Sequence, residues 1–156
     1  MQLHCPFARV GGTAVLSRTP EVSGSFACAA GSGLASAVFE TTQGPVRVAS
    51  VHLHWPWPYR QRSQVKAMAS EMSTWDEPVI MGGDFNMVRW SWALRDIGRS
   101  ARASAIGRTH ITLAEKAYGM RLSIDHVLAS GTGSVEARPT LGSDHRGLLA
   151  RIALDP

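Results

Sequence analysis

The sequence has few cysteines and no long hydrophobic segment. Its two cysteines, Cys5 and Cys28, have no second cysteine or histidine at zinc-finger spacing. A reduced pair is therefore expected, with a disulfide as the alternative in an oxidising compartment. No apolar run approaches the roughly 18 residues that cross a bilayer. Residues 1–10 also lack the layout of a secretory signal, so we expect this chain to stay in the cytoplasm.

Long runs of like charge are also missing, which excludes a basic tail. Nevertheless, 14 arginines and two lysines against 12 acidic residues leave a formal net charge of +4. Arginine pairs bidentately with phosphate, so this balance suits a polyanionic partner. A genome-wide preference for arginine, alanine and glycine would give the same composition, and both explanations stay open.

The length of 156 residues, 44% of them hydrophobic, is sufficient for one domain over 1–156 with its own core. The 15 glycines and 8 prolines follow no period, which excludes a collagen-like chain. No internal repeat or linker divides the sequence. It therefore reads as one globular unit.

Apolar periodicity predicts a sheet with a few helices. One helix is expected over 60–75, where every third or fourth residue is apolar, and a second over 90–100. The segment 101–121 gives no clear pattern. Strands are expected at 13–17, 25–30, 34–40, 46–54, 78–83, 123–129, 135–138 and 147–154. Strands and helices alternate in the second half, which favours an α/β or α+β architecture over a bundle or a barrel.

Polar side chains stand at the ends of apolar strands. Asp84 and Asn86 follow one strand and would share a face if the chain stayed extended, Asp125 lies inside another, and Asp144 and His145 precede the last. Carboxylates and carboxamides suit Mg²⁺ or Mn²⁺, and a histidine beside an aspartate can be a general base. A turn or polar loop would use the same residue types. Together, however, the segments favour a site.

Three motifs resemble the endonuclease/exonuclease/phosphatase superfamily in order and spacing: Gly82–Asn86, Ile124–Val127 and Gly142–Gly147. Segments 12–20 and 51–53 are similar to its hairpin strand and its central histidine strand. The superfamily contains DNase-I-like nucleases, abasic-site endonucleases, sphingomyelinases and inositol polyphosphate 5-phosphatases. The resemblance implies a DNase-I-like β-sandwich flanked by helices. It also implies a Mg²⁺- or Mn²⁺-dependent hydrolase of phosphate esters, with DNA or phospholipid headgroups as substrates, and longer relatives at a membrane.

The resemblance also implies catalytic roles for individual residues. His145 would be the general base at the attacking water, and Asp125 would orient that histidine. Asp84 would position the water. His52 would contact phosphate or assist the leaving group. The other two residues are Asn86, which would hold a phosphate oxygen, and Asp144, which would belong to the metal site or its immediate surroundings.

Several neighbouring residues are expected to be structural. His54 would share the strand face of His52 and is the alternative to it as the site residue, with His52 favoured. His126 should face away from Asp125. Arg60 and Arg146 could touch phosphate but are expected to be solvated. The tryptophans of the motif segments are expected to pack in the core or at its rim, with base stacking or headgroup insertion as alternatives: Trp55, Trp57, Trp90 and Trp92.

The sequence departs from the family pattern near its beginning. Family members also supply an asparagine and a metal-binding glutamate before the strand at 13–17, and the twelve residues before it contain neither. Glu21 lies after that strand and has no match. We therefore expect an N-terminally truncated fold, a weakly held cation and weak or absent hydrolysis by this chain alone. Self-association, or a partner that supplies strands, could cover the exposed sheet.

The alternative function, from another class, is a non-catalytic module that binds phosphate or nucleic acid. Among enzymes, nuclease and phospholipid phosphodiesterase stay open, because the basic charge favours the first and the tryptophans the second. A zinc hydrolase is disfavoured, since no His-x-x-x-His pair or cysteine cluster is present.

Overall fold

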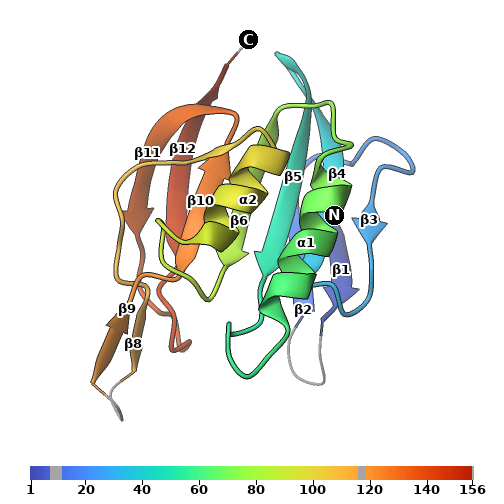
Figure 1. Ribbon diagram of the computed structural model, residues 1–156. Helices are drawn as coiled ribbons and strands as arrows, with labels where there is room; N and C mark the ends of the chain where they lie inside the picture. The colour runs from blue at the N-terminus through green and yellow to red at the C-terminus, as the bar shows by residue number, and fades with distance from the viewer. Residues whose placement is uncertain (8–11, 116–118, 156) are drawn as a thin grey trace.

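A six-stranded mixed sheet organises the protein (Figure 1). The computed structural model describes residues 1–7, 12–115 and 119–155. The sheet has the order β3-β4-β5-β6-β10-β7. Its strands are β3 (Ala27–Cys28), β4 (Leu34–Thr41), β5 (Gly44–His52), β6 (Val79–Asp84), β7 (Ser104–Ala105) and β10 (Asp125–Ala129). The remaining strands form hairpins, β1 (Gln2–Pro6) with β2 (Gly12–Leu16), β8 (Leu113–Glu115) with β9 (Met120–Leu122), and β11 (Gly131–Ala137) with β12 (Leu148–Leu154).

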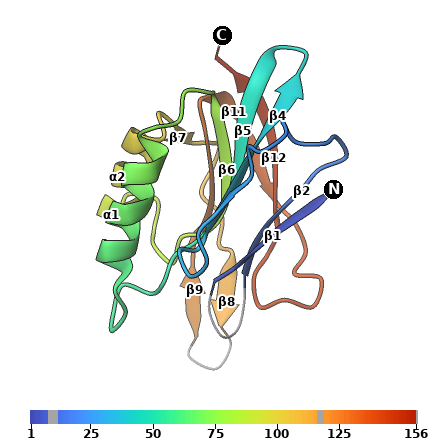
Figure 2. The same cartoon turned by 90° about the vertical axis from the view of Figure 1, so that its right-hand side faces the viewer.

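The helices α1 (Gln61–Met72) and α2 (Trp92–Ser100) lie together on one face of this sheet (Figure 2). The apolar stripe of α1 is buried, as its spacing predicts. The α2 helix begins at Ser91, whose side chain accepts a hydrogen bond from the Leu94 N–H at 3.3 Å, a typical N-cap. Both helices bury their apolar sides against alternate residues of β5 and β6, including Val51 and Met81. This layer forms the largest cluster of the core.

The β1–β2 and β11–β12 hairpins cover the opposite face. The alternation of β4 shows the division, because Leu34 belongs to the cluster beneath the helices, whereas Ala35 and Phe39 pack with Val15 of β2. A third cluster lies near β10, where Val135 of β11 packs with Ile106 and Ala129. The result is a helix layer, a sheet and a hairpin layer, which confirms the expected α+β architecture.

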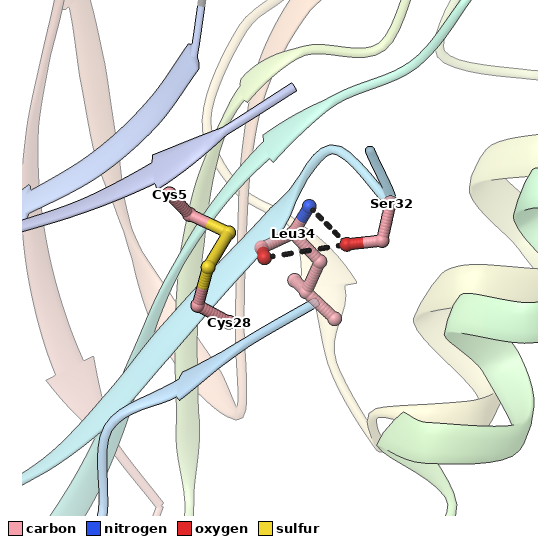
Figure 3. The surroundings of a disulfide bond; sticks show 4 residues. All are labelled: Cys5, Cys28, Ser32 and Leu34. Carbon is pink, nitrogen blue, oxygen red and sulfur yellow. Dashed lines mark hydrogen bonds between the residues drawn. A yellow bond between two sulfur atoms is a disulfide. The ribbon is translucent and has the colours of Figure 1, made fainter. Parts of the chain in front are cut away.

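A disulfide between Cys5 and Cys28 joins β1 to β3 (Figure 3). The expectation of a reduced pair is therefore wrong, because the hairpin layer brings the two Cα atoms within 5.5 Å of each other. Beside it, the Leu34 N–H donates a hydrogen bond to Ser32 Oγ at 3.1 Å, which fixes the turn before β4. The disulfide thus ties the first hairpin to the edge of the central sheet.

The other differences lie where local pattern is weak. The sequence pattern predicts no strand at β1, and the segment 101–121, which gives no clear pattern, contains β7, β8 and the first two residues of β9. The strand β5 ends at His52, so His54 lies in the following loop and does not continue the strand face. In the part of the chain that the structure describes, no helix has the length and apolarity needed to span a membrane.

Candidate active site

Three neighbouring strands bring His52, Asp84 and Asp125 into one row. The strands β5 and β6 run parallel and pair His52 with Asp84, while β10 runs antiparallel to β6 and pairs Asp125 with Asp84. Residues paired across neighbouring strands point to the same face of a sheet. That face is the one covered by the hairpins, because alternate residues such as Val51 and Leu128 point to the helices. The row therefore lies at the ends of three inner strands, which together form one end of the sheet, on the face opposite the helix layer.

The backbone turns sharply after Asp84. A side chain at Gly83 would place its Cβ 1.9 Å from the Val51 carbonyl oxygen, so glycine permits the close approach of β5 and β6 here. Asn86 has a φ of 47° and donates its backbone N–H to Asp84 Oδ1 at 2.8 Å. Asp84 and Asn86 consequently do not share an extended face, and that expectation is wrong. The segment forms the Asx-type turn that the sequence left as its alternative.

The side chain of Asn86 is 5% exposed, and its Nδ2 donates to the Leu53 carbonyl at 2.7 Å. This bond joins the loop after β6 to the end of β5. Contact between Asn86 and a phosphate oxygen stays a prediction.

A histidine–aspartate pair stands at the centre of the site. His145 Nδ1 lies 2.8 Å from Asp125 Oδ2, which leaves the other ring nitrogen, Nε2, for a substrate or water. Partial burial lowers the pKa of His145, but the hydrogen bond and charge of Asp125 and the charge of Asp84 outweigh it, so the pKa is raised. The pair has the arrangement of a general base oriented by a carboxylate.

Thr112 holds both members of this pair and was missed by the sequence analysis. Its buried Oγ1 accepts the Asp125 N–H at 3.1 Å, and its carbonyl accepts the Arg146 N–H at 2.8 Å, directly after His145. Because Thr112 lies in the segment without periodicity, no local signal marks it. It fixes the position of the dyad through the backbone.

The charges of the row act on one another. Burial raises the pKa of Asp84 to about 6, with the neighbouring carboxylate of Asp125 as a further cause and the Asn86 N–H opposing it. Burial also lowers the pKa of His52, and the nearby His54 and His145 act in the same direction. His52 Nε2 lies 3.7 Å from Asp84 Oδ2. Titratable groups with perturbed pKa values at one sheet edge are typical of a catalytic site.

Asp84, Asp125 and His145 each offer a ligand atom, and these atoms all lie within 4.8 Å of one another. Two carboxylates and an imidazole suit a hard divalent cation, so the donor set fits Mg²⁺ or Mn²⁺. Asp144, the expected metal residue, is exposed and lies outside this group. Its Oδ1 accepts the Ser143 hydroxyl at 3.3 Å, and its charge contributes to the raised pKa of Asp84. Asp144 therefore stands at the rim of the acidic cluster.

Two glutamines of α1 hold the strand tips and were also missed. Gln64 Oε1 accepts the His54 N–H at 2.8 Å, and Gln64 Nε2 donates to the carbonyls of Ser32 and His52 at 2.8 and 2.9 Å. The fully buried Gln61 donates to the Phe85 carbonyl at 3.4 Å. The sequence signal that could have revealed them is the presence of glutamines beside the apolar stripe of the predicted helix.

The other residues singled out fall outside the row. His54 lies against the rings of Phe7 and Tyr59, with centroid distances of 4.6 and 5.8 Å. His126 is buried, its Nε2 is 2.9 Å from the Met87 carbonyl oxygen, and it is structural as expected. Arg60 and Arg146 are exposed, also as expected.

The tryptophans divide into two groups. Trp92 packs against the core as predicted. The expected packing is wrong for Trp57 and Trp90, which are 84% and 73% exposed, whereas Trp55, at 39%, is more than half covered. They lie on the loops that follow β5 and β6, and thus near the edge that carries the row.

The fold and site define a class of protein, the DNase-I-like α+β fold with polar residues gathered at one sheet edge. An endonuclease/exonuclease/phosphatase family protein from Leptotrichia buccalis C-1013-b superimposes with a TM-score of 0.70 at 12% identity, covering 99% of this chain and 70% of that one. A mannosyl-6-phosphatase from Bacteroides thetaiotaomicron VPI-5482 gives a TM-score of 0.58 at 12% identity, covering 78% and 57%. A beta toxin variant from Staphylococcus aureus with bound magnesium ions gives 0.55 at 16% identity, covering 78% and 58%.

The pattern of the Endonuclease/Exonuclease/phosphatase family matches residues 3–145. The chain belongs to this family. A search of curated proteins found no match. The chain spans little more than half the length of the phosphatase and the toxin variant.

Proposed function

We propose that this chain is a metal-dependent hydrolase of phosphate esters in which His145 activates water. The observation that carries the proposal is the 2.8 Å contact between His145 Nδ1 and Asp125 Oδ2, next to the acidic row. The contact fixes the tautomer and orientation of the imidazole, so that Nε2 is free to accept a proton from water. The raised pKa of His145 makes it a stronger base than an isolated histidine.

Three other residues of the site, Asp84, His52 and Asn86, have roles in this proposal. Asp84 accepts a hydrogen bond from the attacking water once its carboxyl group is ionised, above about pH 6. His52, held near Asp84 at 3.7 Å, contacts the phosphate or assists the leaving group. Asn86 Nδ2 donates one of its two N–H groups to the Leu53 carbonyl, and in this proposal the other N–H holds a phosphate oxygen.

The carboxylates of Asp84 and Asp125 lie where a divalent cation would bind, with Asp144 at the rim of this cluster. When bound, such a cation would supply Lewis-acid chemistry by neutralising charge on the phosphate. Because Asp125 already accepts from His145 and Asp144 is exposed, few committed oxygen ligands are left. We infer weak binding of Mg²⁺ or Mn²⁺ and slow hydrolysis by the isolated chain.

The second candidate function is a module that binds phosphate without turnover. The small number of metal-ligating groups in the acidic cluster favours it. As substrates, DNA and phospholipid headgroups both fit a phosphodiester site. Self-association, or a partner that supplies strands, is a further proposal. For location, disulfides persist mainly in oxidising compartments, so the Cys5–Cys28 bond favours such a compartment over the expected cytoplasm.

The test is hydrolysis of bis(p-nitrophenyl) phosphate by the purified chain across a titration of Mg²⁺ or Mn²⁺, with EDTA as the blank. We expect slow turnover that needs millimolar cation. Turnover that saturates at micromolar cation would refute the weak site. No turnover at any concentration, with salt-sensitive binding of DNA that chelator does not change, would favour the non-catalytic module.

A further inference from the structure

A cleft rich in arginine lies on the helix side of the sheet, away from the dyad. It has a volume of about 510 Å³ and runs between α2 and the edge strand β7. Leu128 at its wall points to the helix layer, whereas Asp125 on the same strand points to the hairpin layer. None of the side chains that line the cleft is acidic. Four of them are arginines, Arg89, Arg95, Arg99 and Arg102.

Two of these arginines are held in place by backbone carbonyls. Arg89 donates to the carbonyls of Ala105 and Gly107, and Arg102 donates to the carbonyl of Trp75. A guanidinium has five N–H donors, so both keep further donors for a ligand. Half of the cationic lining is thus ordered before anything binds.

The other two arginines repel each other. Arg95 and Arg99 are exposed and four residues apart on α2, a spacing at which like charges destabilise a helix. Within residues 1–7, 12–115 and 119–155, none of the four guanidinium groups forms an ion pair. An anion in the cleft would remove this repulsion and satisfy the free donors.

We propose that this cleft binds the phosphate backbone of single-stranded nucleic acid. Arg95 and Arg99 lie about 6 Å apart along the axis of α2, while Arg89 precedes this helix and Arg102 follows it, so the positive charges occur before, along and after α2. This distribution suits a chain of phosphates better than a single one. Trp90, 73% exposed, directly follows Arg89 and offers a ring on which a base can stack. A concave site of this kind receives a strand, whereas a bilayer presents a broad surface. The proposal goes beyond the proposed function, because binding here needs neither a metal nor His145.

The test is the affinity of the full chain for a fluorescent 20-residue oligothymidylate in EDTA, over a series of salt concentrations. The double variant Arg95→Ala/Arg99→Ala removes two charges. Its matched control, Arg18→Glu, changes the net charge equally at an exposed position after β2, on the far side of the sheet. We expect the double variant to bind at least tenfold more weakly and the control to stay within twofold. The log–log salt slope of the double variant should be smaller by about 1.4, for two lost contacts.

Other outcomes separate the alternatives. Trp90→Ala should weaken binding about fivefold or more through loss of stacking. Equal losses in the double variant and the control, or no binding at low salt, would overturn the proposal. Tight binding to phosphatidylglycerol vesicles without oligonucleotide binding would overturn it in favour of a membrane surface. Hydrolysis of bis(p-nitrophenyl) phosphate is measured in parallel, so that a failure of catalysis and a failure of this cleft are seen separately.

Discussion

The ionised side chain of Asp84 should lower the free energy of unfolding of the protein. Its side chain is only 20% exposed, and burial raises its pKa from 3.8 to about 6. Because the folded-state pKa lies above the unfolded value, the folded state binds the proton more tightly. Stability from this group is therefore lost as the pH rises from about 4 to about 6, and the full cost remains above that range.

The magnitude follows from the size of the shift. A difference of about two pKa units corresponds to about 3 kcal/mol between the charged and neutral forms. The substitution Asp84→Asn removes the charge and keeps an oxygen that can accept the Asn86 N–H. Because the group is coupled to Asp125 and His145, we expect a gain of about 1–3 kcal/mol in the free energy of unfolding, or roughly 3–9 °C in Tm.

The assay is thermal unfolding in EDTA between pH 4 and pH 8. The gain should be absent near pH 4, grow to about pH 6 and stay constant above it. The value at pH 8 is decisive, because that pH lies furthest above the pKa of Asp84. Asp96→Asn, at an exposed position on α2, serves as the control and should change stability by less than about 0.5 kcal/mol. A loss of stability in Asp84→Asn at pH 8, or a gain independent of pH, would refute the reasoning.

Three further changes have expected results. Gln64→Ala leaves backbone groups at the strand tips unpaired and should lower the free energy of unfolding by about 1–3 kcal/mol in urea titrations. Gln64→Glu keeps the acceptor oxygen but not the donor, so its stability should lie between those of the parent and Gln64→Ala. Replacing Cys5 and Cys28 by serine opens a loop of separation 23 and should cost about 3 kcal/mol, measured against the oxidised parent. Asp125→Asn removes the carboxylate that orients His145, so turnover should fall at least tenfold and the acid limb of the pH–rate profile should move to lower pH.

The sequence predicts the elements whose pattern is strong. The stripe of α1 and the apolar strands β4, β5 and β6 follow from periodicity, because a buried face repeats at a fixed interval. The strand β1 and the segment before β9 escape prediction. Their pairing depends on contacts with distant strands, and short strands carry little local pattern.

The candidate site divides in the same way. Motif order marks Asp84, Asp125 and His145, and the register of the sheet then brings them together. Thr112 and Gln64 act through backbone groups at positions that only the folded chain defines, so spacing could not reveal them. The turn at Asn86 depends on a positive φ, which local sequence allows but does not require.

The most direct measurement is the Mg²⁺-dependent rate of bis(p-nitrophenyl) phosphate hydrolysis in the parent chain, in His145→Ala and in His4→Ala, an exposed histidine outside the site. Thermal unfolding verifies that each variant is folded. We expect His145→Ala to lose at least about a hundredfold in rate and His4→Ala to match the parent. An unchanged rate in folded His145→Ala would contradict the proposal that the pair of His145 and Asp125 activates the attacking water.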